Sequence, residues 1–241
     1  MEKGWVVEVD RWFCAALIVE SNRSAQKACR EFDSPLLRAS VAHAFATVRT
    51  LKLAVEVAAL AASYIRCIFG LGWAVNDFGA QTLAETAVWI ASKVNDDFPI
   101  SVCRIRAARV GERPKVSVYK NLEMQILEDL EFRLMFVTAV DFMRFFVGAG
   151  PRSSRKLRRA LYLFMEHGSV SMPESQQKVP EFAAACVLAA CKRTRTRIGP
   201  WITHFRFMWP GIHRDSVRAI AAVLLESAPK TDNDGEDFFV I

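Results

Sequence analysis

The chain has 241 residues, 52% of them hydrophobic and 24% charged, and it carries a formal net charge of +6. This length can bury a sizeable core in one large domain or in two domains of about 100 residues. Long alternating runs of Val, Ile and Thr do not occur, which argues against a sheet and favours an all-α protein. The most apolar stretch, 51–72, contains Glu56 and Arg66, so it predicts a buried core helix and not a membrane span.

Apolar residues at helical spacing predict an N-terminal helix and then five further helices before residue 131. The N-terminal helix, at about 5–20, contains acidic residues and lacks a cleavage-site pattern, so we do not expect a signal peptide. Ser34 and Pro35 are typical of a helix start, and the Ala-rich helix that follows is expected to be central and fully buried. The five helices are expected at about 35–50, 54–70, 78–94, 100–109 and 115–130.

A second series of five helices begins at Thr138 and is punctuated by Gly and Pro. These helices are expected at about 138–147, 153–166, 180–194, 198–208 and 213–227. Five helices followed by five more indicate a structural repeat, although the two halves share little residue-for-residue identity. The tail from Pro229 is acidic and is expected to be disordered.

The sequence lacks the common catalytic motifs, including the nucleophile elbow, the zinc-protease helix and the phosphate-binding loops. The four histidines lie on separate predicted helices, and no two carboxylates have the spacing of an acid and a base. The six cysteines lie far apart without a C-x-x-C pair, which predicts reduced, buried thiols in a cytosolic or nuclear protein. We therefore expect no enzymatic activity, no cofactor and no metal site.

Four segments share an order and a spacing with a known family. They read LRASVAHAF at 37–45, LAASYIRCIF at 60–69, IASKVNDDFP at 90–99 and EMQILEDLEFRL at 123–134, with TAVDF after the last. Together they resemble the cyclins over about residues 36–147. The resemblance implies an all-α fold of two tandem five-helix cyclin-box domains preceded by an N-terminal helix. The implied parts are 1–34 for the N-terminal helix and loop, 35–135 for a first, kinase-binding box, 136–228 for a second box and 229–241 for an acidic tail.

The resemblance also implies a partner and a binding surface. Cyclins form a heterodimer with a cyclin-dependent protein kinase, and two charged residues hold main-chain groups of the loop that enters the kinase's regulatory C-helix. The matching positions here are Lys93 and Glu123. The apolar contacts implied beside them are Val94, Leu127 and Leu134, with Phe98 and Ile100 at the rim. Without the resemblance, the two charges would be interpreted as an ordinary salt bridge or as two solvated groups.

Several positions depart from the cyclin pattern. Arg66 and Cys67 replace an acidic-basic pair, so a buried ion pair common in the family is expected to be missing. The positions that line a substrate-docking groove in many cyclins are smaller or more polar here, which argues against docking of Arg-x-Leu substrates. These positions are Leu37, Ser40, Val41, Ala44 and Gln81. The departures are typical of compact, divergent cyclins, such as those of viruses or distant protists.

The resemblance implies a regulatory subunit that activates the kinase and is located in the nucleus and cytoplasm. Two alternatives to this function remain. Arginines cluster at Arg104, Arg106 and Arg109, at 152–159 and at 192–197, which would suit a nucleic-acid-binding protein similar to the helical core of transcription factor IIB. A solvated basic face is the more ordinary explanation, so a nucleic-acid partner is not favoured. The other alternative is a scaffold that has the fold without activating a kinase. For the activator we expect substrates or inhibitors of the complex as further partners, and no membrane.

Overall fold

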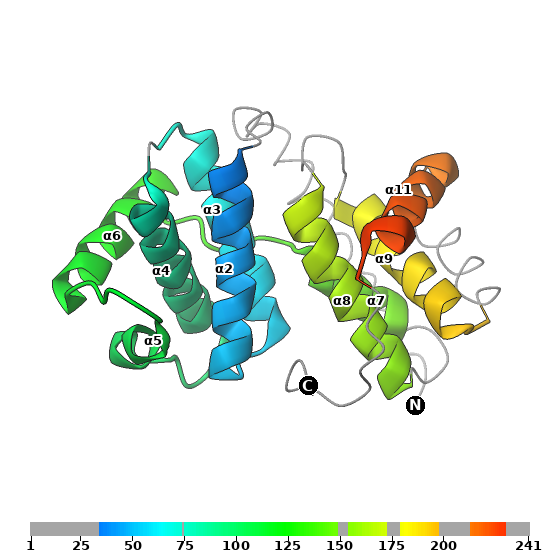
Figure 1. Ribbon diagram of the computed structural model, residues 1–241, viewed down its shortest axis with the longest axis horizontal. Coiled ribbons are helices and arrows are strands. Elements are labelled where there is room, and N and C mark those ends of the chain that lie inside the picture. Colours follow the sequence, from blue (N-terminus) through cyan, green and yellow to red (C-terminus); the bar gives the residue numbers. More distant parts are fainter. Residues whose placement is uncertain (1–33, 74, 149–153, 173–178, 198–212, 230–241) are drawn as a thin grey trace, which may run out of the picture.

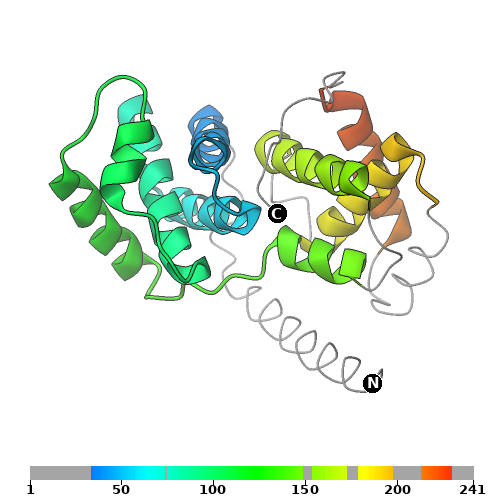
Figure 2. The same ribbon diagram turned by 90° about the horizontal axis from the view of Figure 1, so that it is seen from below.

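The structure is a computed structural model, and it describes residues 34–73, 75–148, 154–172, 179–197 and 213–229. Every regular element in these ranges is an α-helix, as the sequence predicts. Figure 1 shows the helices in two neighbouring groups, and Figure 2 shows the segment that connects them. The helices predicted at 5–20 and 198–208, and the acidic tail beyond Pro229, lie outside the described residues.

The first group contains the helices predicted before residue 131, with ends close to the predicted ones. They are α2 (Pro35–Leu51), α3 (Val55–Gly70), α4 (Asp77–Asn95), α5 (Val102–Ala108) and α6 (Val116–Asp129). Side chains fix three of the starts, because Ser34, Asn76 and Ser101 each accept a hydrogen bond from the backbone N–H three residues later. The local signals in the sequence therefore set where these helices begin.

The second group contains α7 (Ala139–Gly148), α8 (Arg155–Ser171), α9 (Val179–Thr194) and α11 (Arg214–Ser227). Helix α8 continues past its predicted end at 166 and includes Gly168. A Cβ atom on Gly168 would lie 2.5 Å from the Phe182 ring and 2.9 Å from Leu224. The glycine weakens the helix locally, but it lets α9 and α11 pack closely against α8.

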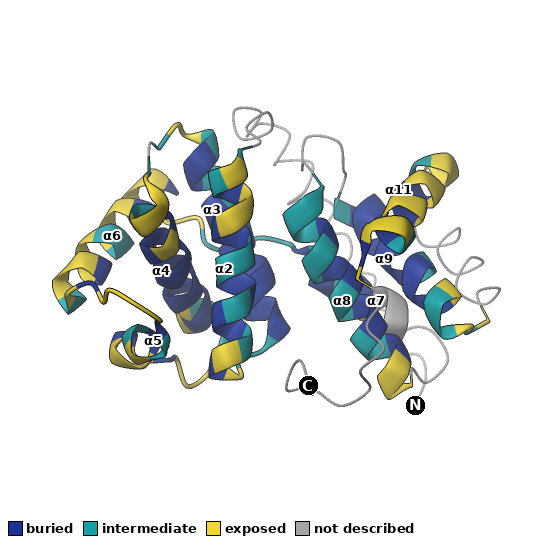
Figure 3. Cartoon of the chain, viewed as in Figure 1, coloured by how far each residue is buried: buried dark blue, intermediate teal, exposed yellow. Residues whose placement is uncertain are grey.

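Helices α3 and α4 form the buried centre of the first group, whereas α6 is largely exposed (Figure 3). Helix α2 packs against α3, α4, α5 and α8, so it is central, as the sequence predicts. The prediction that α2 is fully buried is wrong, because Arg38, Ala39 and Thr50 are exposed. One strip of the helix faces solvent, while Ser40, Ala44 and Thr47 are buried on the opposite side.

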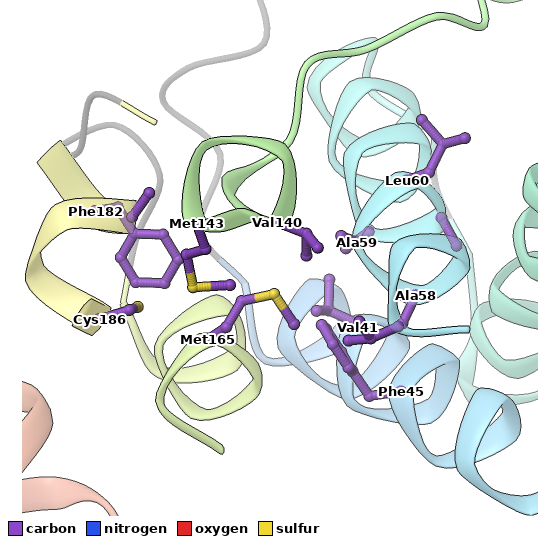
Figure 4. Packing of buried hydrophobic residues seen from close by; sticks show 14 of the residues in the cluster. Val41, Phe45, Ala58, Ala59, Leu60, Val140, Met143, Met165, Phe182 and Cys186 are labelled. Carbon is purple, nitrogen blue, oxygen red and sulfur yellow. The ribbon is translucent and has the colours of Figure 1, made fainter. Parts of the chain in front are cut away.

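A continuous apolar core joins the two groups. Val41 and Phe45 of α2 and Ala59 of α3 face Val140 of α7 and Met165 of α8 (Figure 4). An ion pair adds to this junction, with 2.9 Å between Arg49 Nη1 of α2 and Glu166 Oε1 of α8. The proposed boundary between residues 135 and 136 thus crosses a shared core, and the division into two five-helix boxes stays a prediction.

Candidate functional site

Lys93 and Glu123, which are 30 residues apart in the sequence, meet at the end of the first helix group. Lys93 lies in the last turn of α4, where a cation interacts favourably with the helix dipole, and Glu123 lies in the middle of α6. Lys93 Nζ donates a hydrogen bond to Glu123 Oε1 over 2.5 Å, and it lies 3.6 Å from the centroid of the Trp89 ring. The Lys93 side chain is 38% exposed and that of Glu123 is 15% exposed. Both charges remain accessible at the surface.

Val94 directly follows Lys93, and Leu127 lies one turn beyond Glu123 on α6; the apolar contacts that the resemblance implies beside the pair stay a prediction. Val94, Leu127 and Leu134 are half-buried and pack with one side against the core. Phe98 is 93% exposed, which suits a contact with a partner. Ile100 is only 6% exposed and packs in a small cluster with Trp89 and Tyr119, so the prediction of a rim contact at Ile100 is wrong.

Two further exposed apolar residues were missed in the sequence. Phe132 is 63% exposed and Met135 is 81% exposed, and both follow α6 in the segment that leads to α7. Glu131 and Phe132 have left-handed backbone conformations, with φ of 51° and 57°, which are uncommon for residues other than glycine. Exposed apolar side chains on a strained turn fit a contact surface. The sequence does contain a signal for these two residues, because they are apolar and directly follow an amphipathic helix.

Side chains of α3 and of the α3–α4 connection hold the end of α6 and the segment that follows it. The Tyr64 hydroxyl donates a hydrogen bond to the carbonyl oxygen of Leu134 over 2.7 Å, and burial raises the pKa of Tyr64. Trp73 Nε1 donates to Asp129 Oδ2 over 2.7 Å. These two contacts fix the backbone on which Leu134 and its exposed neighbours are placed.

A buried polar network, which the sequence did not reveal, lies deeper between α4 and α6. Its centre is the Glu85 carboxylate on α4, and the Glu85 side chain is 2% exposed. Arg109 Nη1 donates to Glu85 Oε2 over 2.9 Å, the Tyr119 hydroxyl donates to the same oxygen over 2.6 Å, and His43 Nε2 lies 3.0 Å from Glu85 Oε1. Arg109 also donates to Thr82 and Gln81. The network thus connects α2, α4, the end of α5 and α6.

These contacts decide the ionisation of Glu85. Burial alone would raise the pKa of this carboxyl group, but hydrogen bonds with His43 and Tyr119 and the nearby Arg109 guanidinium together lower the pKa below its usual value. Burial and the neighbouring Glu85 charge raise the pKa of Tyr119. Glu85 is therefore a buried anion that Arg109 neutralises and that hydrogen bonds with Tyr119 and His43 further stabilise.

This network bears on two expectations from the sequence, and it overturns one of them. An ion pair was expected to be missing where Arg66 and Cys67 replace the family's residues, and Arg66 donates to the carbonyl oxygen of Ser169. The buried pair Glu85–Arg109 forms at another place. Arg109 was assigned to an arginine cluster that could bind nucleic acid, and that assignment is wrong because the Arg109 side chain is 2% exposed. Arg106 of the same cluster donates to the backbone carbonyl of Pro114.

The positions considered for a substrate-docking groove do not share an exposed surface. Leu37, Val41 and Ala44 are buried in the core, as is Ser40, while Gln81 is exposed and accepts a hydrogen bond from Arg109. Four of these positions lie on α2, which packs against α3, α4 and α8, and Gln81 lies on α4. The structure gives no support to docking at these positions.

The described residues also bear on the expected thiols and on metal and membrane chemistry. Cys186 and Cys191 are buried and free, as predicted, and burial raises the pKa of Cys191 to about 11; Cys103 is free but exposed, unlike the prediction. Within the described ranges, no three His, Cys, Asp or Glu side chains gather as metal ligands. None of the described helices has the length and apolar character needed to cross a bilayer.

Comparison with known proteins places this arrangement in a family. Residues 22–135 match the family described as "Cyclin, N-terminal domain". Just under half of the chain is therefore assigned to the cyclin N-terminal domain family. A viral cyclin from herpesvirus saimiri has a similar solved structure, with a TM-score of 0.66 and 15% sequence identity over 81% of this chain and 87% of that chain. At this identity the likeness shows the fold.

No curated protein matches the chain in sequence. Cyclins are regulatory proteins rather than enzymes, and Lys93 and Glu123 both lie within the matched range.

Proposed function

We propose that the chain is a regulatory subunit that binds a cyclin-dependent Ser/Thr protein kinase as a heterodimer and holds the kinase's C-helix in its active position. The observation that carries the proposal is the accessible Lys93–Glu123 pair beside half-buried and exposed apolar side chains. The family match to the cyclin N-terminal domain supports it. Its role would be control of cell-cycle progression, in the nucleus and the cytoplasm.

The chemistry of the pair suits the recognition of a loop backbone. A loop that enters an interface carries unpaired N–H and C=O groups, and each one left without a partner costs about 1–3 kcal/mol. The Lys93 ammonium can donate to carbonyl oxygens, and the Glu123 carboxylate can accept from N–H groups. Because the two groups already lie 2.5 Å apart, they offer a donor and an acceptor at neighbouring points of the surface.

The apolar residues would supply most of the binding free energy. An active kinase needs an ion pair between a strand lysine and a glutamate of its C-helix. If about 1% of the free kinase has that arrangement, reversing the ratio requires about 5.5 kcal/mol of differential binding. Leu127 and Leu134 offer half-buried faces, and Phe98, Phe132 and Met135 offer exposed ones. Burying these side chains against a helix is the type of contact that supplies such an energy.

Binding to purified cyclin-dependent kinases tests the proposal, with Lys93→Glu and Glu123→Lys as the first variants. Each variant should bind at least about tenfold more weakly. Each one places two like charges side by side at positions 93 and 123, and it removes either the donor or the acceptor that is proposed to bind the partner's backbone. A matched control is Arg218→Glu on α11, which reverses a cation of an exposed pair in the other helix group. Wild type that binds none of the kinases, or variants that bind as well as the control, would show the assignment to be wrong.

The same samples separate the two alternatives. Phosphorylation of a model substrate by the complex should rise over that by the kinase alone, whereas a scaffold would bind without this rise. A nucleic-acid-binding protein would show an affinity for duplex DNA that falls steeply with salt. Two arginines of the first cluster, Arg106 and Arg109, already form hydrogen bonds within the chain, which weakens that alternative.

A further inference from the structure

Helices α4 and α6 contact each other at two levels along their lengths, an inner one and an outer one. The same face of each helix supplies both contacts. Glu85, Trp89 and Lys93 follow one another at intervals of four residues on α4, and Tyr119 and Glu123 do so on α6. At the inner level the Tyr119 hydroxyl donates to Glu85 over 2.6 Å, and at the outer level Lys93 donates to Glu123 over 2.5 Å. Trp89 lies between the levels, because it packs in a cluster with Tyr119 and carries Lys93 over its ring.

Helix α6 buries little of its own surface, although Leu122 and Leu127 pack against the core and Trp73 donates a hydrogen bond to Asp129 at its end. Of its 14 residues, only Tyr119 and Ile126 are buried, and Figure 3 shows most of its surface exposed. Ile126 is an apolar contact and tolerates small rotations of the helix. The Tyr119 hydrogen bond is directional and fully buried, so it fixes how α6 is rotated against α4.

The acceptor of that hydrogen bond is itself held firmly. Glu85 lies on α4, His43 comes from α2, and Arg109 follows α5, so three elements orient one carboxylate. The Arg109 guanidinium is in turn held by Thr82 and Gln81 and lies over the Phe78 ring. A buried anion with this many partners has little freedom to follow a moving helix.

The geometry points to a positioning role for this network: Glu85 and Tyr119 set the placement of α6 and, one turn along that helix, of Glu123 against Lys93. Tyr119 is then a positioning residue and not a contact residue, since its side chain is buried. Its effect on kinase binding rests on the function proposed above. Its effect on α6 does not, because that effect is a property of the free chain.

Tyr119→Phe tests the role, because it removes the hydroxyl and keeps the ring in the core. Hydrogen exchange of backbone amides in the full chain should become about tenfold faster in α6, the size of effect expected for one hydrogen bond to a charged group, while α8 and α9 keep their rates. Kinase affinity should fall by a similar factor. Tyr162→Phe on α8 is the matched control, since it removes a hydroxyl from the other helix group and should leave α6 exchange and kinase affinity unchanged.

The outcomes separate this inference from the proposed function. Unchanged exchange in α6, or equal acceleration in every helix, would overturn the positioning role. Faster exchange in α6 with unchanged kinase affinity would overturn the link between the network and the site. Faster exchange in α6, in a chain whose wild type binds no kinase, would support the positioning role and refute the proposed function alone.

Discussion

Helix α4 carries two charged groups that differ in almost every physical respect. Near its middle, Glu85 pairs with Arg109, and both side chains are 2% exposed. At its end, Lys93 pairs with Glu123, and these side chains are 38% and 15% exposed. The inner pair is surrounded by further hydrogen-bond partners, whereas the outer pair lies beside accessible apolar side chains. The inner charges have all their contacts within the protein, whereas the outer charges are exposed enough to contact another protein.

The difference follows from desolvation. A buried ion pair that loses one member leaves the other charge without water or partner, so its removal is strongly destabilising. An exposed pair contributes little to stability, because water and salt screen both charges. The outer pair can therefore exchange its internal contact for contacts with another protein at little cost to folding.

The largest effect is expected from Glu85→Leu, which breaks the inner pair and leaves the Arg109 charge buried. The free energy of unfolding should fall by about 3–5 kcal/mol, as measured by urea denaturation. A matched control is Glu131→Leu, since Glu131 pairs with Arg133 and both side chains are about 70% exposed. The control should change stability by less than about 0.5 kcal/mol. Equal effects at the two sites would remove the contrast between inner and outer charges.

A smaller effect is expected from acid. The pKa of Glu85 is lowered in the folded state, so its stabilising contribution is complete above the unfolded pKa of about 4.5 and is lost as pH falls through the folded value. Burial raises the pKa of Glu166, which acts in the opposite direction. The difference in stability between wild type and Glu85→Leu isolates Glu85. This difference should stay nearly constant from pH 6 to about pH 5 and should shrink below that as denaturation is repeated down to about pH 3. A constant difference would contradict the ionised state assigned to Glu85.

The smallest effect is expected from Lys93→Ala in the free chain. Loss of the outer pair should lower the free energy of unfolding by less than about 1 kcal/mol, and by less still in about 1 M NaCl, where screening is strong. Chemical denaturation at low and high salt measures both values. A loss above about 2 kcal/mol would mean that Lys93 is part of the structural core of the chain.

The sequence predicted most of the fold because helix caps, turn residues and apolar spacing are local signals. It also predicted that Lys93 and Glu123 lie at one surface. That prediction came only from the cyclin resemblance, since nothing in the spacing of the two residues requires it. The Glu85 network was missed because His43, Arg109 and Tyr119 lie 42, 24 and 34 residues from Glu85. An arginine among other arginines was interpreted as surface charge. A glutamate within the apolar stretch of α4 was the one available sign of a buried partner.

The most direct test of the central claim is the kinase affinity of the double variant Lys93→Glu with Glu123→Lys. This variant keeps an ion pair between α4 and α6 but presents each charge at the other's position. If the pair recognises a partner's backbone, calorimetry should show binding at least about 100-fold weaker than wild type while the helical content is unchanged. Binding restored to within about threefold of wild type would show that the pair serves only the fold, and would contradict the account.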